Sequence, residues 1–144
     1  MDDGHAGPAD PPRLNILLVE VTPVTDAIAG PPLASGPTTA TATPLKLLYL
    51  LSYFGPPQKA QLMLGATELA LHQRPVLEPT LIREALDNHP DLQDCGLDQQ
   101  EERMRMLPSA LALDELTRLW SCLGPTPYTL STLYEASVLT LTPA

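Results

Sequence analysis

One continuous stretch, residues 116–138, constrains the fold more than any other part of the chain; it reads LTRLWSCLGPTPYTLSTLYEASV. Apolar residues recur there at the i, i+3, i+4, i+7 spacing of a helix with one buried stripe, which we assign to the structural core: Leu116, Leu119, Trp120 and Leu123. Gly124 stands where a helix end needs a residue that tolerates positive φ, and Pro125 prevents the helix from continuing. Residues 128–142 are rich in Thr, Tyr, Leu and Val and predict a strand. Nothing in this stretch is reactive, so it indicates assembly rather than catalysis.

The length and composition are those of one domain with an unusually uncharged surface. A chain of 144 residues can bury roughly 68–70% of its unfolded surface as a single domain, which we place at 13–144. Charged residues make up 17% of the chain, against about 25% in a typical domain. Either partner subunits cover part of this surface, or the exposed surface simply carries few charges.

The charge balance excludes several classes of partner. The formal net charge is −9 with only 8 Lys plus Arg, which argues against nucleic acid and against direct binding to an anionic membrane. Cys95 and Cys122 have neither zinc-ligand spacing nor a disulfide framework, so a reduced, cytoplasmic origin is the default expectation. Residues 1–12 form an acidic, Pro-rich segment without the apolar region of a secretory signal, and we expect this tail to be disordered.

The first half of the domain predicts two strands separated by a long loop. Residues 14–21 (LNILLVEV) are apolar on both faces, as in a strand that is covered on both sides. Residues 22–44 are punctuated by Pro and Gly and predict a flexible loop or an arm ordered by assembly. Residues 45–54 (LKLLYLLSYF) predict a second, central strand, with a helix as the alternative for so short an apolar run.

A helix follows, opened by Pro56 and Pro57 and running to about His72. It is apolar around most of its circumference, which predicts burial by more than one neighbour, one of which could be another subunit. We therefore assign candidate interface residues to this helix and to the C-terminal strand: Leu62, Met63, Ala66, Leu69, Leu130, Leu133, Val138 and Leu139. That strand is our candidate for pairing with an extended arm of another subunit.

The remaining elements complete an α+β domain. Residues 77–102 combine short helical segments with an acidic loop, and residues 103–113 alternate like a strand in which Pro108 indicates an edge or a bulge. The predicted architecture is a small mixed or antiparallel sheet flanked by at least two helices.

No catalytic or metal-binding constellation occurs in the sequence. The acidic residues between Asp87 and Asp98 are interrupted by Pro90 and Gly96 and lack a calcium-loop pattern, so a solvated loop is the favoured interpretation. His5, His72 and His89 have no ligand at suitable spacing, and nucleophile-elbow, GxGxxG and P-loop motifs are missing. We expect neither an enzyme nor a cofactor.

The order of these segments resembles the cap, or tail-terminator, proteins of phage-tail-like extracellular contractile injection systems. The likeness covers roughly residues 14–142. Its most specific parts are the Leu-Trp-Ser-x-Leu-Gly-x-Thr-Pro-Tyr block at 119–128, the Leu-Ser and Tyr-Glu pairs that follow it, and the helix exit at 64–77.

The resemblance implies a structural protein with a tail-terminator-like fold. Such proteins form a sixfold homo-oligomeric ring that binds tube and sheath subunits, ends their polymerisation and stabilises the extended sheath. It also implies assembly in the cytoplasm, within a particle that can be released. A second cap protein is a further expected partner.

The chain departs from this family at its beginning. Relatives usually carry several tens of residues, with a helix and a strand, before the equivalent of Leu14. We therefore expect a sheet one strand short, and an alternative role as a cap adaptor that binds a second cap ring, cargo or a membrane component of the particle.

Overall fold

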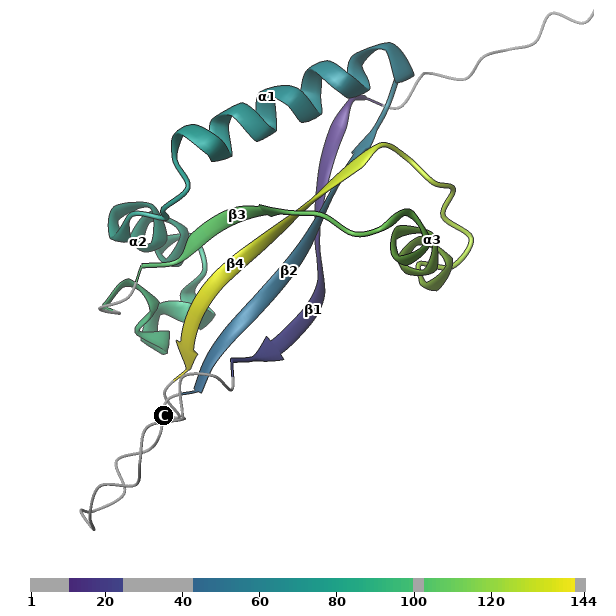
Figure 1. Cartoon of the computed structure of the whole chain (residues 1–144). Coiled ribbons are helices and arrows are strands. Elements are labelled where there is room, and N and C mark those ends of the chain that lie inside the picture. The colour runs from purple at the N-terminus through teal and green to yellow at the C-terminus, as the bar shows by residue number, and fades with distance from the viewer. Residues whose placement is uncertain (1–10, 25–42, 100–102, 142–144) are drawn as a thin grey trace, which may run out of the picture.

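The computed structural model describes residues 11–24, 43–99 and 103–141, which are built around one four-stranded sheet (Figure 1). The strands are β1 (Arg13–Pro23), β2 (Thr43–Phe54), β3 (Arg105–Ser109) and β4 (Ser131–Leu141). Their order in the sheet is β1-β2-β4-β3, and each neighbouring pair is antiparallel. The α-helices of the described residues are α1 (Ala60–Gln73), α2 (Pro79–Asp87) and α3 (Leu113–Cys122). The predicted α+β class is therefore confirmed, and the sheet is antiparallel rather than mixed.

Helices α1 and α3 pack on opposite faces of the sheet. Tyr53 of β2 packs with Ala60 and Leu64 of α1, whereas Leu50 of β2 packs with Trp120 of α3. Residues an odd number of positions apart on a strand project to opposite faces, so the two helices lie on either side of the sheet, as Figure 1 shows. The core is thus divided into two clusters by the sheet itself.

Strand β2 is central, as its apolar pattern predicted, and the alternative helix is excluded. It pairs with β1 along one edge and with β4 along the other. Leu50, Leu51 and Tyr53 are almost completely buried on its two faces. A strand covered on both faces must be apolar at consecutive positions, which explains the run LKLLYLLSYF.

The prediction that residues 14–21 form a strand covered on both sides is wrong in its second part. β1 lies at the edge of the sheet, and Ile16 is 65% exposed while Leu17, Leu18 and Val21 are also exposed. The helices pack mainly over β2 and β4, so much of β1 stays uncovered by the residues that the structure describes. Local periodicity cannot distinguish a covered strand from an apolar strand that awaits a partner.

The proposal that the C-terminal strand pairs with another subunit is also corrected by the strand order. β4 lies between β2 and β3 and hydrogen-bonds to both. It begins at Ser131 rather than at residue 128. A strand with a neighbour on each side has no free edge along the paired positions, which on the β3 side run from Leu133 to Ser137. The longest open edge of the described sheet is therefore that of β1.

The opposite edge strand, β3, is short and partly covered. It spans Arg105–Ser109 instead of the predicted 103–113, and Pro108 lies on an edge strand as predicted. Its outer side is bridged by the preceding chain: Leu77 N donates to Met104 O at 2.9 Å and Met106 N donates to Pro75 O at 2.7 Å. The sheet therefore has one covered edge and one open edge among the described residues.

The other boundaries follow proline and glycine positions. The 3-10 turn η2 (Pro57–Lys59) precedes α1, and the acidic segment forms η3 (Pro90–Cys95) and η4 (Leu97–Gln99), separated by Gly96 at φ +67°. Gly124 has φ +74° just after α3, which confirms the predicted helix stop. The predicted loop at 22–44 falls mostly on residues 25–42, and the predicted tail on residues 1–10, all outside the described residues. No helix in the described ranges is both long and apolar enough to cross a bilayer.

Candidate functional site: assembly surfaces

The residues with reactive side chains do not converge. His72 and His89 are exposed on separate segments, and Cys95 and Cys122 are exposed free thiols. His5 lies outside the described residues. Within the ranges that the structure covers, no group of three or more His, Cys, Asp or Glu side chains is placed to hold a metal ion. The features that remain are the apolar surfaces left uncovered in the described part of the chain.

The four residues predicted as structural core come together in one cluster. Trp120 is 7% exposed and packs with Leu50 and Leu133, and the cluster also receives the partly buried Leu116, Leu119 and Leu123. Tyr128 meets the Trp120 ring edge-on, with 5.3 Å between the ring centroids. The indole nitrogen Nε1 is buried and has no hydrogen-bond partner among the described residues. This cluster fixes α3 on the sheet.

Helix α1 presents an apolar stripe to the outside, which we call the α1 stripe. Leu62, Ala66 and Leu69 are exposed and have the i, i+4, i+7 spacing of one helix face; Leu62 is 73% exposed. Met63, the fourth candidate on this helix, packs instead against the cluster around Tyr53. The predicted second neighbour of this helix is thus not supplied by the described part of the chain.

The helix is held to the sheet in part by a polar contact. Thr132 Oγ1 on β4 donates to Glu68 Oε1 on α1 at 2.8 Å. Burial raises the pKa of the Tyr134 phenol, and the nearby Glu68 carboxylate raises it further. A neutral phenol beneath the helix is therefore maintained up to alkaline pH.

The residues of the C-terminal segment that we assigned to an interface lie in different environments. Leu133 is buried beside Trp120, so its side chain faces the interior of the subunit and is not available to a partner. Leu130 lies before β4 and is 41% exposed. Val138 and Leu139 belong to β4, but their side chains lie outside the part of the chain whose burial is described.

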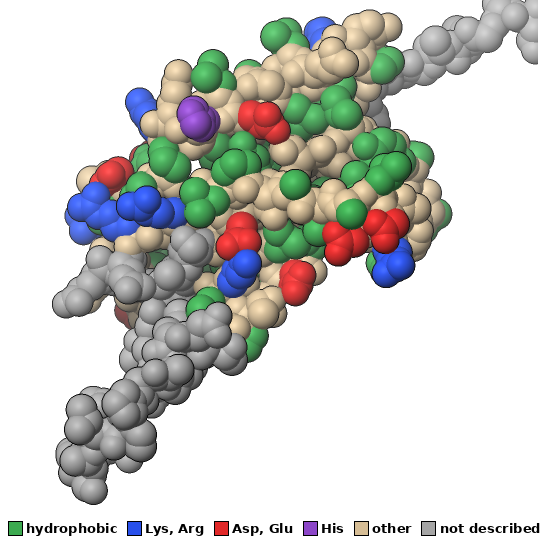
Figure 2. All heavy atoms as spheres, viewed as in Figure 1, with side chains coloured by type: hydrophobic (Ala, Val, Ile, Leu, Met, Phe, Trp, Pro, Cys, Tyr) green, Lys and Arg blue, Asp and Glu red, His purple; other side chains and the backbone are tan. Residues whose placement is uncertain are grey.

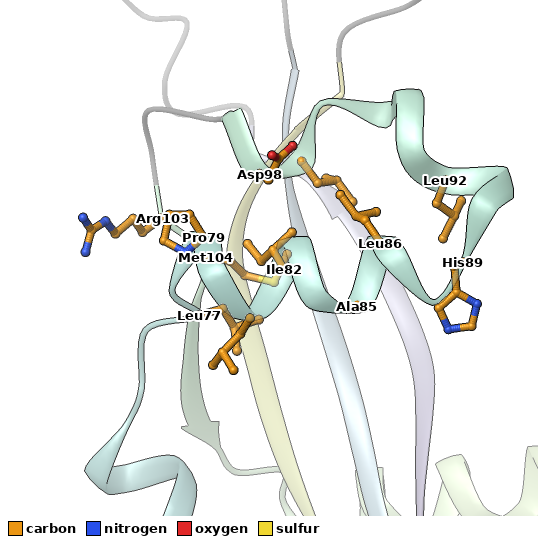
Figure 3. A pocket seen from close by; sticks show the side chains of 12 residues that line it. Leu77, Pro79, Ile82, Ala85, Leu86, His89, Leu92, Asp98, Arg103 and Met104 are labelled. Atoms are coloured by element: carbon orange, nitrogen blue, oxygen red, sulfur yellow. The ribbon is translucent and has the colours of Figure 1, made fainter.

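A pocket of about 330 Å³ lies beside α2, η3 and η4 (Figure 3). Its lining is almost wholly apolar and includes Leu77, Leu81, Ile82, Ala85, Leu86, Leu92, Leu97 and Met104. Two ion pairs join the surrounding segments: Arg83 Nε to Asp98 Oδ2 at 3.3 Å and Arg103 Nη1 to Glu78 Oε2 at 3.1 Å. Figure 3 shows the Arg103 guanidinium directed away from the cavity, so this charge stands at the rim. We call this cavity the α2 pocket.

Sequence reasoning missed the α2 pocket although a signal for it was present. Leu81 and Ala85, and likewise Ile82 and Leu86, repeat at i, i+4 and mark one apolar face of α2. The acidic residues that follow this helix favoured the interpretation of the next segment as a solvated loop. In the structure that segment folds into the turns that wall the cavity.

The remaining surface is poor in charge. In Figure 2, apolar side chains appear at many places on the viewed face; Lys and Arg gather at its left edge, and the other charged side chains are scattered. Twelve large hydrophobic residues are exposed in the described ranges, including members of β1, α1 and the α2 pocket. Scattered exposed apolar residues are ordinary, but an apolar stripe, an apolar edge strand and an apolar pocket together indicate surfaces that bind other proteins.

A family model described as the Pvc16 N-terminal domain matches residues 2–144. No curated protein matches the sequence.

Proposed function

The chain belongs to the Pvc16 N-terminal domain family of phage-tail-like injection-system proteins, and from this premise we propose that it forms the cap ring of a contractile particle. In this role the ring ends tube and sheath polymerisation and stabilises the extended sheath. The part played by each subunit is structural and needs no catalytic residue. The particle assembles in the cytoplasm and can then be released.

The observation that carries the proposal is the presence of two separate apolar surfaces on different helices. A subunit in a closed ring contacts its two neighbours through two different surfaces, whereas a twofold dimer uses the same surface on both partners. The α1 stripe and the α2 pocket supply such a pair. In the proposed ring, the α1 stripe of one protomer packs against the α2 pocket of the next.

The chemistry of the two surfaces supports this pairing. Obligate interfaces are more apolar than transient ones and commonly bury more than about 2,000 Å². The α1 stripe offers protruding Leu side chains, and the α2 pocket offers a cavity lined by Leu, Ile and Met. Burial of one Leu side chain stabilises a contact by about 1.5–3 kcal/mol, so each Leu of the stripe matters for ring formation.

A matched pair of variants tests the ring contact. Leu69→Gln changes an exposed residue of the α1 stripe, and Leu113→Gln changes an exposed residue at the start of α3, away from both surfaces. Native mass spectrometry should show rings for the wild type and Leu113→Gln, and mainly folded monomers for Leu69→Gln. Equal ring formation by both variants would exclude the α1 stripe as a ring contact.

The cap role itself is tested on whole particles. Electron microscopy of particles from cells with and without this chain should show uniform lengths in the first case, and ragged, overlong or sheathless particles in the second. Particles of normal length with a complete sheath in the deletion strain would exclude the cap role.

The second candidate function is that of a cap adaptor joining the cap to another component. The open apolar edge of β1 favours it, because this surface is additional to the two that a ring requires. Co-purification distinguishes the two roles: a cap binds tube or sheath ends by itself, whereas an adaptor requires another cap protein.

A further inference from the structure

We infer that the outer edge of β1 binds an extended segment of a different protein of the particle, which adds to the sheet as a fifth strand. The segment has apolar side chains at alternate positions and a Lys or Arg near Glu20. This inference goes beyond the ring contacts, although one step of it rests on the proposed function.

The outer edge of β1 is unpaired among the described residues. β1 has 11 residues and pairs with β2 on one side only, and no described segment pairs with its other side. In an antiparallel sheet, an edge strand directs alternate backbone N–H and C=O groups outwards. A long edge of this kind is a template for another strand, and natural proteins usually protect it by charges, proline or a covering segment.

The two edges of the sheet differ in how they are protected. β3 is five residues long, contains Pro108 and is covered by hydrogen bonds from the chain near Leu77. β1 is longer and contains no proline before its last residue, and its pairing with β2 is interrupted by a bulge between Leu18 and Glu20. Ahead of that bulge, Ile16, Leu17 and Leu18 are consecutive, apolar and exposed, and no described segment covers their outer edge. A protected edge and an unprotected edge in one sheet indicate that the open edge is used.

An incoming strand would find apolar contacts or space on both faces of β1. Ile16 and Leu18 project to the face covered by α1, and Leu17 projects to the face covered by α3. Beside Leu17, a hollow of about 530 Å³ extends to Trp120 and Leu123 of the α3 region. Side chains of an added strand would enter this hollow on one face and contact Ile16 and Leu18 on the other, so both faces of β1 would become covered.

The segment that pairs with the outer edge of β1 belongs to a different protein and not to a second copy of this chain. Pairing of β1 with β1 of a second copy is a twofold contact that closes after two subunits, whereas the proposed ring requires a head-to-tail contact. A head-to-tail pairing would need the other sheet edge of the neighbour, and the segment around Val76 already bridges that edge. The described sheet otherwise leaves only the ends of β4, before Leu133 and beyond Ser137, without a partner on that side, and these are too short to fill the edge of the 11-residue β1.

A charged side chain on β1 also restricts the sequence of the incoming segment. Glu20 is exposed on β1, where its carboxylate accepts a hydrogen bond from Thr22 Oγ1 at 2.9 Å. The whole chain carries a formal net charge of −9. A cross-strand pair of opposite charges stabilises a sheet, whereas like charges destabilise it, so a basic residue opposite Glu20 is expected.

The test is site-specific photo-crosslinking of the full chain in cells that produce the complete particle. A benzophenone-bearing phenylalanine replaces Ile16 in one strain and Leu113 in the control strain, and the cross-linked peptides are identified by mass spectrometry. The expected adduct from position 16 is a segment of another particle protein with the alternating apolar pattern and a Lys or Arg. Addition of Leu18→Lys should lower its yield about tenfold or more, because the charge replaces apolar burial at the edge, while Leu113→Lys should leave it unchanged.

Three results would overturn the inference. They are an adduct with β1 of a second copy, a yield at position 16 no higher than at position 113, and a yield that Leu18→Lys does not change. Circular dichroism of each purified variant establishes that the subunit is folded. Particle length, measured in the deletion strain by electron microscopy, reports the cap role separately. A heterologous adduct together with normal particle length in the deletion strain would therefore support the strand site while excluding the cap.

Discussion

Replacement of Trp120 by alanine should destabilise the folded subunit by about 3–5 kcal/mol, the usual cost of a large truncation in a core. Trp120 is 7% exposed and joins α3 to both central strands through Leu50 and Leu133. Its edge-on contact with Tyr128 contributes about 1 kcal/mol of this loss. Because small domains are stable by only about 5–15 kcal/mol, the variant should lose a large part of its total stability.

A second variant, at the same position, separates the contribution of aromatic packing from that of the indole N–H group. Trp120→Phe keeps an aromatic ring but removes the buried indole N–H that lacks a partner. An unsatisfied buried donor costs about 1–3 kcal/mol, and the smaller ring leaves a gap of comparable cost. Trp120→Phe should therefore lie within about 1 kcal/mol of the wild type.

Urea denaturation followed by far-ultraviolet circular dichroism measures both variants. Fluorescence cannot serve this comparison, because Trp120 is the single tryptophan of the chain. The reasoning would be refuted by a Trp120→Ala protein that unfolds at the wild-type urea concentration but fails to form rings. That outcome would make Trp120 an interface residue rather than a core residue.

Two further predictions concern the subunit alone. Gly55→Ala should lower the free energy of unfolding by about 1–3 kcal/mol, because Gly55 has φ +142° and an added Cβ would lie 2.8 Å from Tyr53 Oη. Gly65→Ala, whose Cβ would meet nothing within 4 Å, should instead stabilise α1 by about 0.5–1 kcal/mol, and the same urea denaturation measures both variants. Tyr134 contributes stability that is complete below its unfolded pKa of 10.0 and is lost as the pH rises through its higher folded pKa. Tyr134→Phe should therefore weaken the alkaline loss of stability in urea titrations above about pH 10, and an unchanged pH dependence would contradict this role.

Several features of the fold could be predicted from the sequence because they depend on neighbours along the chain. The spacing of Leu116, Leu119, Trp120 and Leu123 defines one helix face, and the structure places these four side chains in one cluster. Gly124 then ends the helix at positive φ, as a local backbone requirement predicts. The continuous apolar run of β2 likewise identified a central strand.

The assembly surfaces were harder to predict because exposure depends on packing between distant segments. The apolar residues of the helix after Pro57 were assigned to an interface, yet Met63 packs inwards while Leu62 and Leu69 remain exposed. The α2 pocket requires the acidic turns to fold back beside α2 and the chain near Met104 to lie alongside. No spacing within one segment encodes that convergence.

The sequence by itself predicted the main helices and strands, with a helix left open as the alternative for β2, because hydrophobic period, proline and glycine act over a few residues. Only the tertiary structure decided which strand is an edge. β1 and β2 are both apolar on two faces, and β4 looked like the strand that would accept a partner. Hydrogen bonding between segments far apart in the chain placed β4 in the centre and left β1 open, because strand order is set by pairing energies that no single strand contains.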